Sequence, residues 1–185
     1  MRMILIFQPD AAALTPSRIA ESLEEGLGLV GLLTDGESKT DPEDYADGDF
    51  SEGDFYIELP DLAEDEGEPT ANYSSIARAD RDETIAEIVK ELVEQEDSLK
   101  STFETNGRDL IISFEDTPAG IEAGSVLAYA VASAVGAGVL LPAFDGDEET
   151  FWFEDAEDFA DYMFSDDEDD EEGDEPTDEP TDEKK

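Results

Sequence analysis

Carboxylate side chains are the most abundant groups in this sequence that can do chemistry, since 54 of its 185 residues are Asp or Glu. Paired carboxylates serve glycoside hydrolysis and two-metal sites, where the two groups must lie at a defined separation. At this density almost any spacing between two acids occurs by chance, so spacing singles out no pair. Asp116 is the best-placed single carboxylate, because it follows an apolar run that is typical of a strand. The same residue also stands where the cap of a following helix begins.

One acidic segment has oxygen-bearing side chains near the spacing of a calcium-binding loop. Asp47, Asp49, Ser51 and Glu58 occupy its positions one, three, five and twelve. Such a loop requires glycine at position six, where this sequence has Glu52, and the twelfth residue falls inside an expected strand. Asp47, Asp49 and Glu58 are therefore the candidate metal ligands, and non-specific condensation of cations on the segment is the alternative.

Histidine and cysteine are both absent from the sequence. Their absence excludes Ser-His-Asp and Cys-His nucleophile systems and the common zinc sites. A Ser–Lys dyad would need Lys39, Lys90 or Lys100, which we expect in a loop or on a polar helix face. The sequence has no glycine-rich phosphate-binding motif and few cations to hold phosphates, which disfavours phosphoryl transfer. We expect no cofactor.

An aromatic group near the C-terminal end is the best candidate for a binding surface. Strand alternation should point Trp152 away from its neighbours Phe151 and Phe153, toward solvent. Helical spacing places Phe159 and Tyr162 on one face of a short helix. Trp152, Phe159 and Tyr162 are therefore the candidate binding residues for a partner protein, and packing in the core is the alternative.

Hydrophobic periodicity and capping residues predict the elements of the first half of the chain. Thr15 and Pro16 form a cap followed by a proline at the first helical position, which begins an amphipathic helix. Strands are expected over 3–7, 29–33 and 55–59. One long acidic loop, over 34–54, is expected between the last two of these strands, and a second, over 60–80, after the third.

The second half repeats the same signals. An apolar stripe of Ile85, Ile88, Val89, Leu92 and Val93 predicts the second helix. Strands are expected over 110–114, 139–141 and 151–153, the last two as a hairpin, and helices over 117–135 and near 159–163.

These elements predict an α+β or mixed α/β fold with helices packed on a sheet of about five strands. Residues 1–164 form the predicted globular domain. Residues 165–185 contain thirteen acids and no apolar residue larger than proline, so we expect an acidic, disordered C-terminal tail. The most apolar segment, 119–144, is interrupted by glycine, proline and Glu122, so we expect no membrane span.

The formal net charge of −44 is the strongest clue to function. Residues 1–164 carry a net charge of −33 and the tail only −11, so the acidity belongs mainly to the predicted domain. Repulsion disfavours nucleic acids and anionic membranes as direct partners and leaves basic or cationic protein surfaces. With no secretion signal and no cysteine, we expect a cytoplasmic protein.

Three hypotheses about function follow from this charge. The first is a non-catalytic, salt-adapted accessory or protein-binding domain, since acidic surfaces stay hydrated and their repulsion is screened in molar salt. The second is a DNA-mimic inhibitor that occupies the basic cleft of a nucleic-acid-binding enzyme. The third is an enzyme that uses carboxylates and a divalent metal.

Overall fold

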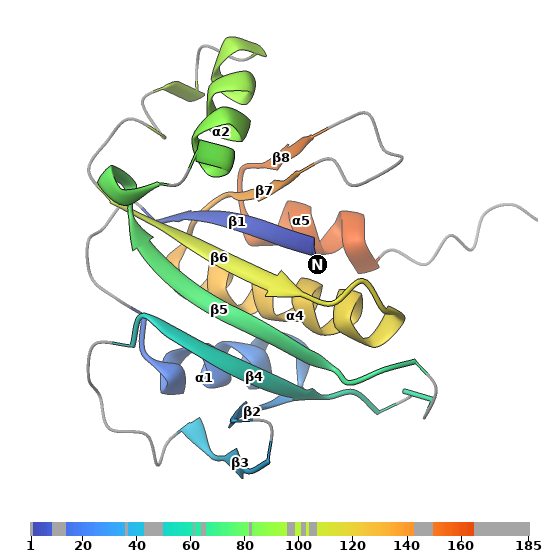
Figure 1. Ribbon diagram of the computed structural model, residues 1–185. Coiled ribbons are helices and arrows are strands. Elements are labelled where there is room, and N and C mark those ends of the chain that lie inside the picture. Colours follow the sequence, from blue (N-terminus) through green and yellow to red (C-terminus); the bar gives the residue numbers. More distant parts are fainter. Residues whose placement is uncertain are drawn as a thin grey trace, which may run out of the picture.

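Within the described residues, eight strands form one antiparallel sheet in the computed structural model of this chain (Figure 1). Their order across the sheet is β3-β2-β4-β5-β6-β1-β7-β8. The structure describes residues 2–8, 14–35, 37–42, 50–60, 62–63, 66–81, 83–95, 99–100, 103, 107–142 and 150–164. The strands are β1 Arg2–Gln8, β2 Val30–Thr34, β3 Lys39–Thr40, β4 Glu52–Glu58, β5 Thr70–Ala77, β6 Arg108–Phe114, β7 Val139–Leu141 and β8 Phe151–Phe153. The helices are α1 Pro16–Leu27, α2 Glu83–Gln95, α4 Pro118–Val135 and α5 Ala156–Phe164, with a 3-10 turn, η2, at Arg78–Asp80.

The strands β1 and β6 are covered on both faces of the sheet. In β1, Ile4 and Ile6 pack into the larger core on one face, and Leu5 and Phe7 pack into a second cluster on the other. A strand that is buried on both faces has an unbroken apolar sequence rather than an alternating one. This explains the continuous apolar run over 3–7.

Three helices, α1, α4 and α5, cover one face of the sheet and enclose the larger core; they lie behind the sheet in Figure 1. The capping signals act as expected, because Thr15 and Thr117 accept hydrogen bonds from the backbone N–H groups of Arg18 and Gly120. Gly28 ends α1 and Gly136 ends α4, each in the left-handed conformation that glycine adopts without strain.

The central helix α4 is apolar on nearly all sides. By length and composition alone it is the one described helix that could cross a membrane. In the structure it packs against α1, α5 and the strands β1, β5 and β6. A Cβ on Gly124 would overlap the ring of Phe114, so glycine lets the helix lie directly on β6 at that point.

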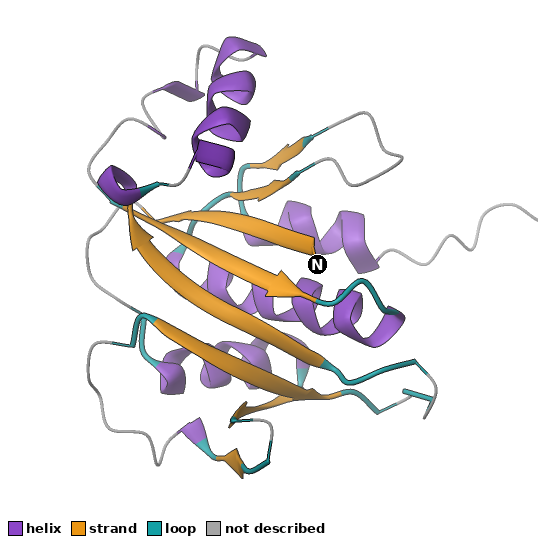
Figure 2. Ribbon diagram, in the orientation of Figure 1, coloured by secondary structure: helices purple, strands orange, loops and turns teal. Residues whose placement is uncertain are grey.

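On the opposite face, α2 covers only part of the sheet (Figure 2). Its apolar stripe packs on side chains from β1, β6, β7 and β8, and Phe103 joins this second cluster. Phe103 lies edge-on to Phe7 at 4.4 Å between ring centroids and to Trp152 at 5.3 Å. The polar side of α2 faces solvent and carries its acids.

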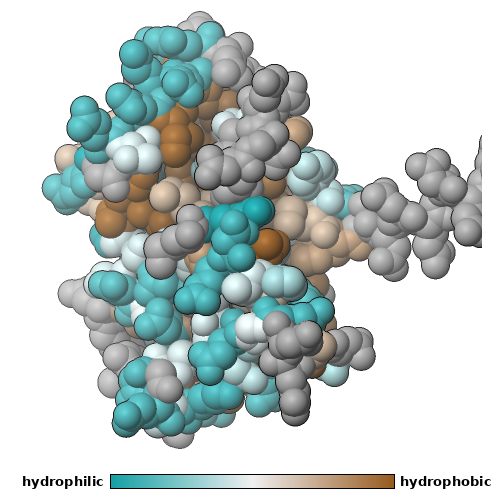
Figure 3. All heavy atoms as spheres, turned by 45° about the vertical axis from the view of Figure 1, so that its right-hand side comes forward, coloured by the Kyte–Doolittle hydropathy of each residue, from teal (hydrophilic) through white to brown (hydrophobic). Residues whose placement is uncertain are grey.

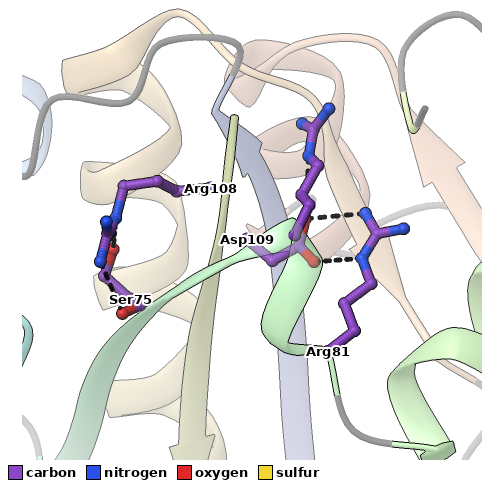
Figure 4. Close-up of polar contacts among 5 residues, drawn as sticks. Ser75, Arg81, Arg108 and Asp109 are labelled. Carbon is purple, nitrogen blue, oxygen red and sulfur yellow. Dashed lines mark hydrogen bonds and ion pairs between the residues drawn. The ribbon is translucent and has the colours of Figure 1, made fainter. Parts of the chain in front are cut away.

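A buried ion cluster joins the turn before α2 to the sheet (Figure 4). Asp109 of β6 has no exposed surface, and its carboxylate accepts hydrogen bonds from Arg78 and Arg81. The Arg81 Nη2 to Asp109 Oδ1 distance is 2.9 Å, and Arg78 Nε lies 3.2 Å from the same oxygen. Both guanidinium groups lie 5.9 Å from the centre of the Phe7 ring. The cluster therefore fixes the chain where it leaves β5 for α2.

The structure confirms a mixed α and β architecture with helices packed on a sheet. It shows that the sheet is antiparallel and corrects the number of described strands, which is eight rather than about five. The largest error is in the loop predicted over 60–80, because β5 occupies 70–77 at the centre of the sheet. The buried residues of β5 are Ala71, Tyr73 and Ser75. Because its sequence, TANYSSIA, has so few large apolar residues, it does not show the apolar pattern of a central strand.

The loop predicted over 34–54 is also partly wrong, because it contains β3 and the start of β4. The capped helices, the apolar strands and the hairpin of β7 and β8 are confirmed. The predicted disordered tail, 165–185, lies outside the described residues.

Tyr73 brings a buried hydroxyl into the larger core. Its ring stacks on Phe50 at 5.3 Å, and its hydroxyl has no hydrogen-bond partner among the described residues. Burial raises the pKa of this hydroxyl above its ordinary value, and the nearby Ser75 and Arg108 only partly oppose that effect.

The Asp109→Asn substitution should lower the free energy of unfolding by about 3–5 kcal/mol, because it removes the charge of a fully buried carboxylate that binds two guanidinium groups. Chemical denaturation at fixed salt measures this. The matched control is Asp116→Asn, which removes an exposed partner of Arg2 and should cost at most about 1 kcal/mol. Equal losses in the two variants would contradict a structural role for the ion cluster.

The Tyr73→Phe substitution should keep or raise stability at neutral pH, since it removes a buried hydroxyl without a partner, which costs about 1–3 kcal/mol. Because the folded-state pKa is raised, the wild type should lose stability as pH rises above the ordinary tyrosine pKa of about 10. The variant should lose less between about pH 9 and 11, as measured by denaturation. The matched control is Tyr162→Phe, which removes the same hydroxyl group from a side chain that is half exposed rather than buried.

Candidate functional site: the open face of the sheet

The half of the sheet that α2 leaves uncovered is the candidate functional site. We call it the open face: the side chains of β2, β4 and β5 that point away from α1 and α4. In Figure 1 no helix lies in front of β4 and β5. Figure 3 shows mostly hydrophilic or neutral surface in the lower half of the molecule, where these strands lie, and hydrophobic surface in the upper half beside α2.

A polar hollow of about 320 Å³ lies on the open face, at the end of the sheet where β5 begins and β6 ends and where Tyr56 of β4 lies opposite Thr70 of β5. Alternation places Asp54 and Tyr56 of β4 on this face, while Phe55 and Ile57 enter the core. The hollow is lined by Thr34, Asp35, Lys39, Asp54, Tyr56, Glu68, Thr70, Ala71, Asn72, Ser113, Phe114 and Glu115.

An ammonium group already sits in this hollow. Lys39 Nζ of β3 lies 3.0 Å from the centre of the Tyr56 ring, which is a cation–π contact. Asp54 accepts a hydrogen bond from Asn72 at 3.0 Å, which orients the carboxylate beside the ring. The hollow thus combines an aromatic face that holds a cation with an oriented carboxylate.

The rim of the hollow is acidic, with Asp35, Glu68 and Glu115 around Lys39. Asp35 is held by its own turn, since its carboxylate accepts hydrogen bonds from the backbone N–H groups of Glu37 and Ser38. These bonds hold the pKa of Asp35 below its ordinary value, so the group stays charged. Hydroxyl groups of Thr70 and Ser113 complete the lining.

The arrangement fits binding of a cationic group better than covalent chemistry. Four carboxylates and one aromatic ring stabilise a positive charge. In the part of the chain that the structure describes, no group of three or more acids has the geometry to hold a metal ion. A Ser–Lys dyad needs a serine hydroxyl that is hydrogen-bonded to the lysine. Among the described residues, Lys39 contacts the Tyr56 ring and no serine forms a hydrogen bond with it, so no serine nucleophile is activated here.

The three aromatic candidates do not form one surface. Phe159 is fully buried in the larger core, where its ring lies 5.4 Å from that of Phe153. Trp152 points to the other face, as alternation predicts, but there it packs on Phe7 at 5.7 Å. Tyr162 is 50% exposed and contacts the rings of Phe151 and Phe153.

Of the candidate carboxylates, the structure describes only Glu58 and Asp116. Asp47 and Asp49 lie outside the described residues, and Glu58 is exposed at the end of β4. Asp116 forms an ion pair with Arg2 at 2.6 Å, next to the start of α4. Sequence reasoning missed Tyr56 and Asn72, and it placed Lys39 in a loop. The signal that was available was the alternation of polar and apolar residues along β4.

Comparison with protein-family models, with characterised proteins and with solved structures finds no match to this chain.

If the hollow binds cations, removal of its own ammonium should make room for an external one. We expect the Lys39→Met variant to bind butylammonium at least about threefold more tightly than the wild type, because the Tyr56 ring no longer holds Lys39. The Tyr56→Leu variant should lose binding, because it lacks the ring. NMR chemical shifts of Tyr56, Thr70 and Asn72 measure this. The control is Lys90→Met, which makes the same charge change on the exposed side of α2. Equal shifts on α2 and on the open face would show non-specific attraction instead.

Proposed function

We propose that this chain is a non-catalytic, salt-adapted protein-binding domain that presents its open face to a basic or cationic protein surface. The observation that carries the proposal is the contact between the Lys39 ammonium and the Tyr56 ring within an acidic hollow. A lysine or arginine side chain of a partner would meet the same ring and the same carboxylates.

The distribution of the acids supports salt adaptation. Exposed carboxylates lie on elements that face different directions: Glu21, Glu24 and Glu25 on α1, Glu83, Glu87, Glu91 and Glu94 on α2, Glu52, Asp54 and Glu58 on β4, and Glu157, Asp158 and Asp161 on α5. A DNA mimic requires its charges in ordered rows on one side of the molecule. Acids on all sides instead favour an environment in which the whole surface must stay hydrated and screened.

The use of the cations supports the same interpretation. Each arginine of the sequence makes a contact within the fold: Arg2 with Asp116, Arg18 with the Ala134 carbonyl, Arg78 and Arg81 with Asp109, and Arg108 with Ser75. The carboxylates outnumber these groups so far that most have no cation to pair with. Their mutual repulsion is relieved by salt at high concentration.

The domain should gain stability steeply as potassium chloride rises from about 0.1 to about 3 M, because the Debye length falls from about 10 Å at 0.1 M to about 3 Å at 1 M. Thermal unfolding across this range measures the effect. A domain with the same melting temperature throughout would contradict salt adaptation. The butylammonium titration tests the cation-binding half of the proposal separately.

A further inference from the structure

The strand β2 has a backbone edge that β3 covers only in part. β3 pairs with Leu33 and Thr34, whereas Val30, Gly31 and Leu32 pair with β4 on their other side alone among the described residues. An edge of this kind presents N–H and C=O groups that can pair with another strand.

A groove of about 570 Å³ lies along this edge, between α1 and the chain at Asp41 and Pro42. One wall is α1, which rests directly on β2, because a Cβ on Gly31 would overlap the Leu23 side chain. The Ser17 hydroxyl donates a hydrogen bond to the Pro42 carbonyl at 3.4 Å and joins α1 to the chain beyond β3. The groove thus has α1 as one wall and the chain at Asp41 and Pro42 as the other.

The walls of the groove are acidic and its floor is apolar. Glu21, Glu24 and Glu25 of α1 and Asp41 line it, and no lysine or arginine is among the described residues that line it. Leu29, Val30 and Leu32 supply apolar surface, and Val30 is 47% exposed. Such a groove attracts a chain that carries positive charge and some apolar side chains.

The geometry of an added strand specifies the pattern of that chain. Gly31 and Leu33 of β2 point toward α1, while Val30 and Leu32 point to the open face. In a strand paired with this edge, successive side chains would alternate in the same way. One set would face the glutamates of α1, and the other set would lie beside Val30 and Leu32.

We propose that the edge of β2 binds an extended segment of a partner protein by strand addition, and that this segment alternates basic and apolar residues. The main-chain pairing supplies affinity and the alternating contacts supply specificity. A second copy of the chain and its own acidic tail both carry negative charge, which disfavours them as occupants. The inference deepens the proposed function by naming the chemistry of the partner segment.

The test is binding of a fluorescent, acetylated peptide of alternating lysine and valine to the full chain, at the lowest fixed salt concentration at which every variant stays folded, because salt screens contacts between exposed charges. The variant Glu21→Gln/Glu24→Gln/Glu25→Gln should weaken binding roughly tenfold, because three contacts between exposed charges are lost. The matched control, Glu83→Gln/Glu87→Gln/Glu91→Gln, makes the same charge change on α2 and should weaken it less than about twofold. Equal weakening by the two variants would overturn the groove as the site.

A second peptide tests the main-chain pairing itself. N-methylation of alternate amides keeps every side chain and charge but removes the N–H donors that strand addition needs, so binding should be lost. Equal binding of the methylated peptide would overturn strand addition.

A third measurement separates a partner segment from a second copy of the chain. Dimerisation that the α1 variant abolishes, seen by sedimentation without peptide, would overturn the basic segment as the occupant. Failure of these tests leaves the butylammonium result at the open face unaffected, because Lys39 and Tyr56 are unchanged in every variant.

Discussion

Burial of β1 and β6 on both faces is the constraint on which the rest of this structure depends. The larger core needs α1, α4 and α5 on one side, and the outward side chains Leu5, Phe7 and Ile111 need a second cover on the other. Among the described residues, α2, Leu99 and Phe103 supply that cover, and the cluster that they form reaches β7 and β8 on one side and Ile76 of β5 on the other. The outward sides of β2 and β4 are therefore left without a helix over them among the described residues, and they become the open face.

The buried cluster of Asp109, Arg78 and Arg81 fixes the position of α2 and so determines which part of the sheet is covered. It lies where β5 turns toward α2, at the boundary between the covered and the open parts of the second face. Breaking a buried ion pair is far more costly than losing an exposed one, so the cluster defines where α2 can sit. Although the chain has a net charge of −44, these two arginines bind a buried carboxylate and have little exposed surface.

The short strand β3 links the two proposed binding surfaces. Its Lys39 lies in the hollow of the open face, and the chain directly after it, at Asp41, lines the groove beside β2. Because β3 pairs through only two residues, it leaves most of the β2 edge accessible while it supplies a cation to Tyr56. A strand added to this edge would lie next to β3 along β2.

The sequence by itself determined the capped helices, the apolar strands and the excess of acid, because these depend on local periodicity, on capping chemistry and on charge counts. It did not reveal β5, since TANYSSIA gains its burial from its sheet neighbours β4 and β6 and from α4, which lie far from it in the sequence. It also gave no sign that Lys39 would meet Tyr56, or that Asp109 would meet two arginines about 30 residues earlier in the chain. Those pairings depend on strand order and register, which only the tertiary structure decides, because they join residues far apart in the sequence.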